Sequence, residues 1–156
     1  MNPKEELSRM LREAAIVAAR KDFLSFIRFM APTIIPDFVE GRHINLIAAK
    51  LQAVEEGKIR RLIIAMPPRS MKSRNGNILF PAWVLGRHPT WDIMCLSYAK
   101  EMATDFSREV RNLVRDEDYL SIFPRMGLRP DSKAAFRWHT NVGGMYTAGG
   151  IASGIS

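Results

Sequence analysis

The chain has 156 residues, of which 47% are hydrophobic and 25% charged, a balance typical of one globular domain and not of a disordered segment. Its 23 basic residues outnumber 16 acidic ones, and the net charge of +7 favours polyanionic partners: DNA, RNA or nucleotides. The single cysteine, Cys95, excludes an intrachain disulfide and is predicted to be a buried core thiol. No apolar run reaches the roughly 20 residues that span a bilayer, so we expect a cytoplasmic protein without a membrane partner.

Residues 1–40 are predicted to form a helical N-terminal arm. Apolar residues recur at helical spacing over residues 7–18, and an aromatic and aliphatic cluster follows over residues 23–30. Pro32 and Pro36 then interrupt the pattern and are expected to end the helix. We interpret the arm as packed on the core of the main domain, residues 41–156.

The next elements alternate between helix and strand. A helix is predicted to begin near His43 and to end at Gly57, a residue suited to a C-terminal cap. The continuous apolar run 62–65 is predicted to be a strand buried on both faces, and residues 91–97 (WDIMCLS) are predicted to be a second buried strand. A helix over residues 99–115 follows the second strand. This order indicates an α/β fold with a parallel sheet flanked by helices.

The remaining third of the chain is less regular. Acidic residues 116–118 are expected to end the preceding helix, on which Arg108, Arg111 and Arg115 form either a DNA-phosphate contact or a solvated face. Residues 136–139 and 145–148 are predicted to be two short strands joined around residues 141–144.

A loop with the chemistry of a phosphate site lies between the predicted strand 62–65 and the helix after it. It ends in Lys72-Ser73, where a phosphate-binding loop places its lysine for the phosphates and its hydroxyl for Mg²⁺. Met66 and Met71 occupy the two positions at which the strict pattern has glycine. By itself the loop is equally consistent with an ordinary strand-to-helix turn carrying an exposed lysine.

Residues 61–73, RLIIAMPPRSMKS, resemble the nucleotide loop of the large terminase subunits of tailed bacteriophages. Residues 80–89, FPAWVLGRHP, and 97–108, SYAKEMATDFSR, are similar to further segments of that family, and the helix over residues 42–58 has matching spacing. The resemblance covers approximately residues 22 to 156.

This resemblance implies a P-loop ATPase that uses ATP and Mg²⁺. It implies that Lys72 binds phosphate, that Ser73 helps to hold Mg²⁺, and that Arg69 acts on the γ-phosphate; Lys72 and Arg69 are the residues assigned to catalysis. His43 matches the adenine-side contact but is equally consistent with a capping or exposed histidine. Ser97 and Tyr98 match a second segment that senses nucleotide or DNA, although packing is the simpler explanation for Tyr98. The ATP-binding set is His43, Pro68, Arg69, Ser70, Met71, Lys72 and Ser73.

The resemblance also implies a phage- or prophage-encoded motor in the bacterial cytoplasm. Its partners are double-stranded DNA, the small terminase subunit and the portal protein, and a homo-oligomer is left open. The chain is expected to stop short of the acidic strand of the ATPase site and of the nuclease domain, so that it hydrolyses ATP negligibly. The alternatives are another P-loop enzyme, such as a helicase, translocase or kinase, and a basic DNA-binding module without a working nucleotide site.

Overall fold

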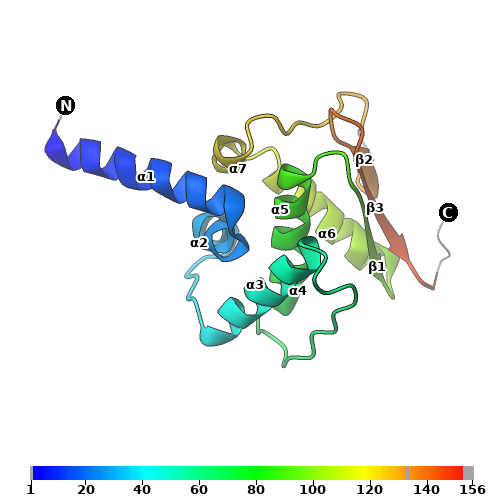
Figure 1. The fold of residues 1–156 in the computed structure, drawn as a ribbon. Coiled ribbons are helices and arrows are strands. Elements are labelled where there is room, and N and C mark those ends of the chain that lie inside the picture. The colour runs from blue at the N-terminus through cyan, green and yellow to red at the C-terminus, as the bar shows by residue number, and fades with distance from the viewer. Residues whose placement is uncertain (1, 133, 153–156) are drawn as a thin grey trace. The chain divides into compact units, whose positions relative to one another are not determined.

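The computed structural model describes residues 2–132 and 134–152. The first part of the chain is helical (Figure 1). Its helices are α1 (Pro3–Lys21), α2 (Phe23–Ile34) and α3 (Arg42–Glu55). The chain divides into two compact units, one up to Lys72 and the other from Ser73 onward. The predicted domain boundary after residue 40 stays a prediction. None of the described helices has the length and apolarity of a membrane span.

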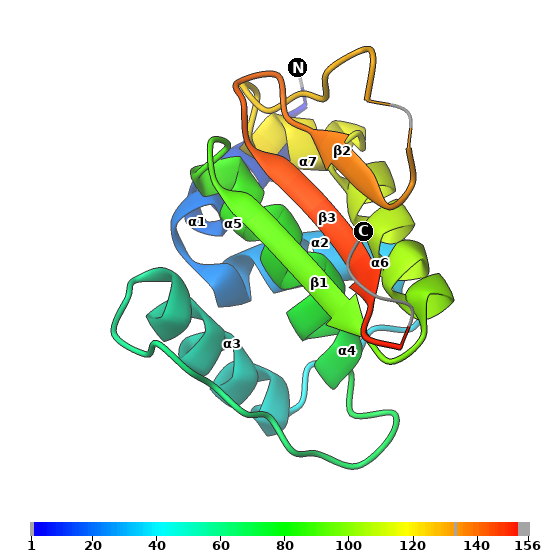
Figure 2. The same ribbon diagram turned by 90° about the vertical axis from the view of Figure 1, so that its right-hand side faces the viewer.

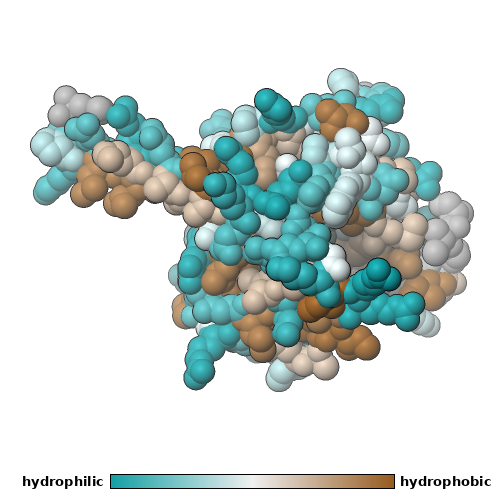
Figure 3. Space-filling view, viewed as in Figure 1, coloured by the Kyte–Doolittle hydropathy of each residue, from teal (hydrophilic) through white to brown (hydrophobic). Residues whose placement is uncertain are grey.

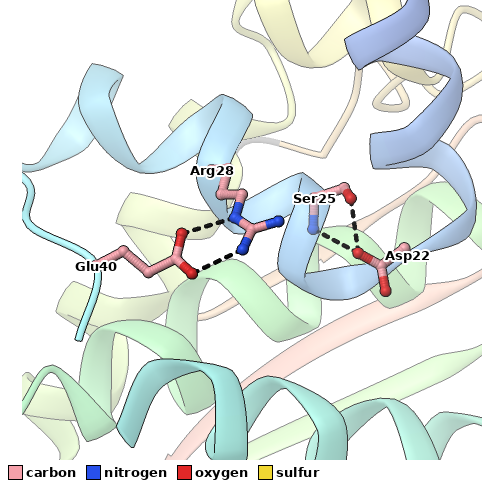
Figure 4. Close-up of polar contacts among 4 residues, drawn as sticks. All are labelled: Asp22, Ser25, Arg28 and Glu40. Carbon is pink, nitrogen blue, oxygen red and sulfur yellow. Dashed lines mark hydrogen bonds and ion pairs between the residues drawn. The ribbon is translucent and has the colours of Figure 1, made fainter. Parts of the chain in front are cut away.

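Polar side chains fix the two turns between these helices (Figure 4). The Asp22 carboxylate accepts hydrogen bonds of 2.7 Å from both the backbone N–H and the hydroxyl of Ser25, which caps the start of α2. Arg28 on α2 forms a two-pronged pair with Glu40, at 2.6 and 2.8 Å, and so ties the connection before α3 back to α2. This pair lowers the pKa of the Glu40 carboxyl.

The predicted arm is helical, but its first half is not packed. Leu7, Met10 and Leu11 on α1 are 57%, 57% and 63% exposed, and Figure 3 shows apolar residues at the surface along this helix. Burial begins at Ala19 and continues through α2, whose inward residues are Phe23, Phe26, Ile27, Met30 and Ala31.

Pro32 does not end α2, contrary to the prediction, because the helix continues to Ile34. The proline lies in the last turn, and the N–H of Ile35 still bonds to the carbonyl of Ala31. The buried residues of the preceding turns hold the helix in place, so packing outweighs the propensity of one residue. The other predicted end is confirmed: Gly57 follows α3 with φ of 74°.

The second unit contains the sheet, shown in Figure 2 with β3 (Met145–Gly150) between β1 (Asp92–Ser97) and β2 (Arg137–His139). β1 and β3 are parallel from Asp92↔Met145 to Ser97↔Gly150, whereas β2 is antiparallel to β3. The predicted strand 91–97 and the predicted pair 136–139 and 145–148 are thereby confirmed as strands. The sheet is mixed and not wholly parallel, because a short connection of residues 140–144 turns the chain back between β2 and β3.

Helices complete this unit. α6 (Lys100–Leu113) packs on β3 and β1, which confirms the helix predicted over residues 99–115. α4 (Lys72–Arg74), a π-helical turn (Asn75–Leu79) and α5 (Phe80–Arg87) follow one another without a break. The acidic residues 116–118 begin a helix instead of ending one: the Asp116 carboxylate accepts from the N–H of Asp118 and caps α7 (Glu117–Ile122).

Two sequence predictions about buried strands are wrong. Residues 61–67 form no strand, and Ile63 is 93% exposed while Leu62 and Ile64 are half-buried. No neighbouring strand pairs with this run among the described residues, so only one side of it is covered. β1 is a strand, but its side chains alternate between exposed and half-buried, with Met94 57% and Leu96 43% exposed. Cys95 is accordingly half-buried, and that burial raises the pKa of its thiol.

Candidate functional site

The loop over residues 66–71 has a backbone that an anion-binding turn requires. Arg69 and Met71 both have positive φ, 62° and 60°, while Ser70 between them does not. Backbone of alternating hand turns successive N–H groups toward a common point, the concave arrangement that binds anions in phosphate loops. Met71 therefore adopts the left-handed conformation for which glycine is usual at this position, despite its side chain.

Lys72 closes this loop from its far end. Its Nζ donates a hydrogen bond of 2.6 Å to the carbonyl oxygen of Met66, the first residue of the loop, and the side chain is half-buried. The lysine side chain therefore links the end of the loop to its first residue. α4 begins at Lys72 itself, so the loop leads directly into helical backbone.

The other predicted loop residues differ in exposure. Pro68, Arg69 and Ser73 are exposed and available to a ligand in solution, whereas the Ser70 hydroxyl oxygen is buried without a hydrogen-bond partner in the described residues. An unsatisfied hydroxyl at this point of the loop costs free energy unless a ligand or water completes it. The residues present thus fit a phosphate group: an ammonium, a guanidinium, a free hydroxyl and a left-handed turn.

His43 lies beside the start of the loop. It lines a hollow of about 260 Å³ together with Leu46, Ile47 and Lys50 of α3 and with residues 62–66. His43 is exposed, and its ring lies so close to Gly41 that a Cβ on that residue would be 2.6 Å from the ring carbon Cε1. His43 and the first residue of the loop, Met66, consequently face the same largely apolar hollow.

The other predicted contacts are not gathered at one place. Arg108 is paired with Asp105 at 2.7 Å, and Arg111 donates to the carbonyl of Ala134 at 3.3 Å, so these two guanidinium groups have separate surroundings. Tyr98 is 80% exposed, which excludes the packing role preferred for it from the sequence. Within the described part of the chain, no three His, Cys, Asp or Glu side chains are grouped closely enough to hold a metal.

Sequence reasoning missed Asn75, in the π-helical turn after the loop. Its side chain is 0% exposed, and neither its amide nitrogen nor its oxygen has a partner among the described residues. The signal available was an amide residue followed by Gly76 at the start of an otherwise apolar helix, a place where helical hydrogen bonding is readily altered.

Comparison with known proteins adds no identification, since no protein-family model, curated protein or solved structure matches the chain.

The left-handed conformation of Met71 has a measurable cost. A non-glycine residue with positive φ is strained by roughly 1–2 kcal/mol, and glycine removes that strain at the expense of greater freedom in the unfolded chain. We expect Met71→Gly to raise the free energy of unfolding by about 0.5–1 kcal/mol, measured by urea denaturation. Met66→Gly is the control, because Met66 lies in the same loop without a positive φ and should only lose stability. Equal losses in both variants would show that Met71 carries no backbone strain.

Proposed function

We propose that residues 66–73 bind the phosphates of Mg-ATP, and that the chain belongs to the ATPase of a viral DNA-packaging motor, the large terminase subunit. The observation that carries the nucleotide site is the Lys72 ammonium, held 2.6 Å from the Met66 carbonyl across a loop of alternating backbone hand. A carbonyl is a weak partner for an ammonium compared with an ionised phosphate. Exchange of that carbonyl for phosphate oxygens is therefore favourable.

Each remaining residue of the loop has a role that its chemistry supports. Arg69 is exposed, and its planar guanidinium is suited to two oxygens of the terminal phosphate. Backbone N–H groups turned inward by the left-handed residues and the unsatisfied Ser70 hydroxyl would meet the inner phosphates. Ser73 would hold Mg²⁺ through its hydroxyl; the ion supplies charge neutralisation between phosphate oxygens. The apolar hollow beside His43 is the place for the adenine ring.

The wider role rests on the family resemblance of the sequence and on charge. A net charge of +7 supports contact with the backbone of double-stranded DNA, which would be independent of base sequence and weaken steeply with salt. A small terminase subunit, a portal protein and further copies of the chain are the partners that such a motor would have in the bacterial cytoplasm. ATP hydrolysis by this chain alone is expected to be negligible, because positioning and charge stabilisation must act together in phosphoryl transfer.

Titration with Mg-ATP tests the nucleotide site. Lys72→Ala should lower the affinity at least tenfold, because it removes the only ammonium placed in the loop among the described residues. Isothermal titration calorimetry would measure both proteins, with circular dichroism to show that the variant is folded. Lys4→Ala is the matched control: it removes the same charge from an exposed site on α1 and should change nothing.

Two results would separate the alternatives. Equal affinity of wild type and Lys72→Ala would remove the phosphate-loop assignment. Absence of ATP binding in both proteins, together with salt-dependent binding to duplex DNA, would instead favour the basic DNA-binding module.

A further inference from the structure

A hollow in the second unit lies far along the chain from the nucleotide loop. It has a volume of about 580 Å³, within the range of roughly 300–1,000 Å³ typical of sites for small ligands. Its apolar lining consists of Val114, Leu120, Met126 and Leu128, from the residues after α6, from α7 and from the segment that follows α7. Val114 and Met126 are almost fully buried, so this surface is continuous with the core of the unit.

The wall over residues 127–132 is fixed by hydrogen bonds to the β2–β3 hairpin. The N–H of Arg129 bonds to the carbonyl of His139 at 3.0 Å, and the N–H of Asn141 bonds to the carbonyl of Gly127 at 2.9 Å. Ser132 accepts from the N–H of His139 through its hydroxyl at 2.6 Å. These bonds hold this wall of the hollow in place before any ligand binds.

Positive charge surrounds the apolar lining. Arg111 lies in the last turn of α6, Arg115 lies two residues beyond the end of that helix, and Arg129 lines the same hollow. Arg129 and Asp131 neutralise each other in a two-pronged pair, at 3.0 and 2.6 Å, so the positive charge at the hollow comes from Arg111 and Arg115. The side chain of Arg115 forms no hydrogen bond or ion pair with any described residue, and no carboxylate lines the hollow. The balance of charge around it is thus positive.

We propose that this hollow binds an anion that carries an apolar body. The anionic group, a carboxylate or a phosphate, meets Arg115, whose guanidinium group can present paired N–H donors, and lies beside the positive charge of Arg111. The apolar body covers Leu120 and Leu128, which are half-buried and so still expose apolar surface to water. Neither group suffices alone: a small anion leaves the two leucines in contact with water, and a neutral apolar molecule gives the Arg115 guanidinium no anion to pair with. This site is independent of the nucleotide loop proposed above.

NMR titration of the isotope-labelled chain with four probes tests the proposal. Two probes are aromatic anions, one is an anion without an apolar body, and one is a neutral aromatic molecule. 1-Naphthyl phosphate and 1-naphthaleneacetate should both bind and shift the amide signals of residues 111–132, and the tighter of the two identifies the preferred anionic group. Inorganic phosphate and neutral 1-naphthol should bind at least tenfold more weakly. Equal binding by 1-naphthol, or shifts confined to residues 66–73, would overturn the proposal.

Matched variants locate the binding. Arg115→Gln should weaken 1-naphthyl phosphate at least tenfold, and because Arg115 is exposed the substitution should leave the fold intact. Arg125→Gln removes the same charge from a nearby exposed residue that does not line the hollow and should have no effect. Leu128→Trp should also block binding by filling the hollow while every arginine remains. Lys72→Ala should leave the affinity unchanged; loss of binding in that variant, or equal losses in Arg115→Gln and Arg125→Gln, would contradict the site.

Discussion

Trp138→Ala should lower the free energy of unfolding of the second unit by about 3–5 kcal/mol, the usual cost of removing a large buried aromatic side chain. Trp138 lies on β2 and is 0% exposed. Its ring stacks on that of Tyr146 in β3, with the centroids 5.1 Å apart and the planes parallel. Its indole Nε1 donates a hydrogen bond of 3.0 Å to the hydroxyl of Ser107 on α6. The side chain thus joins both strands of the hairpin to the helix that packs on them.

Chemical denaturation monitored by circular dichroism would measure this loss. Because domains have a total stability of only about 5–15 kcal/mol, complete unfolding at room temperature is within the expected range. Ser107→Ala keeps the Trp138 ring but leaves its buried indole N–H without a hydrogen-bond acceptor. This variant should lose less unfolding free energy, about 1–3 kcal/mol. Trp91→Ala is the matched control, since Trp91 is 45% exposed and its loss leaves no internal cavity. A Trp138→Ala variant as stable as Trp91→Ala would show that the hairpin is not anchored through this residue.

Much of the second unit could be predicted from local sequence. Residues 99–115 repeat apolar side chains at helical spacing, and α6 follows because its inward side meets the sheet. The hairpin could be predicted because Gly143 and Gly144 separate two short segments that each contain an aromatic residue. Gly143 has φ of 103°, and a Cβ on Gly144 would lie 2.3 Å from the carbonyl oxygen of Pro89. Such turn and packing requirements are carried by a few neighbouring residues.

The wrong predictions involve information from distant residues. An apolar run such as 62–65 becomes a buried strand only if neighbours pair with it, and nothing in the run itself specifies them. The burial of β1 was overestimated for the same reason, since its outward side chains, including Met94, have no cover among the described residues. Asp116 has the chemistry of a helix cap, but whether it ends one helix or starts the next depends on where the chain turns.

The candidate site shows the same division. Lys72-Ser73 and the neighbouring Arg69 could be picked from the sequence because their chemistry is local. The left-handed conformation of Met71 could not be predicted from the sequence. The usual pattern has glycine at this position, and a methionine is unfavourable in a backbone with positive φ. The bond from Lys72 to the Met66 carbonyl and the hollow shared by His43 and the loop are tertiary features. These features depend on the three-dimensional path of the chain, which the spacing of residue types does not predict.

Neighbouring proline substitutions in β1 should have opposite outcomes. The carbonyls of Trp91 and Ser97 accept hydrogen bonds from Met145 and Ile151, at 3.3 and 2.9 Å, so the backbone groups of these odd-numbered residues point toward β3. In a parallel ladder alternate residues face the same neighbour, which places Ile93 with this set and leaves the N–H of Met94 pointing to the other edge. No strand pairs with that edge in the described part of the sheet.

Ile93→Pro should therefore be severely destabilising, whereas Met94→Pro should be tolerated. Proline at residue 93 removes a ladder hydrogen bond and drives its ring toward β3; at residue 94 the missing N–H is one that bonds only to water. Comparison with Ile93→Ala and Met94→Ala subtracts the side-chain contribution at each position. By urea denaturation, the extra cost of proline over alanine should be at least about 2 kcal/mol larger at residue 93 than at residue 94. Equal extra costs at the two positions would mean that the N–H of Met94 is also hydrogen-bonded, and would contradict the placing of β1 at the edge of the sheet.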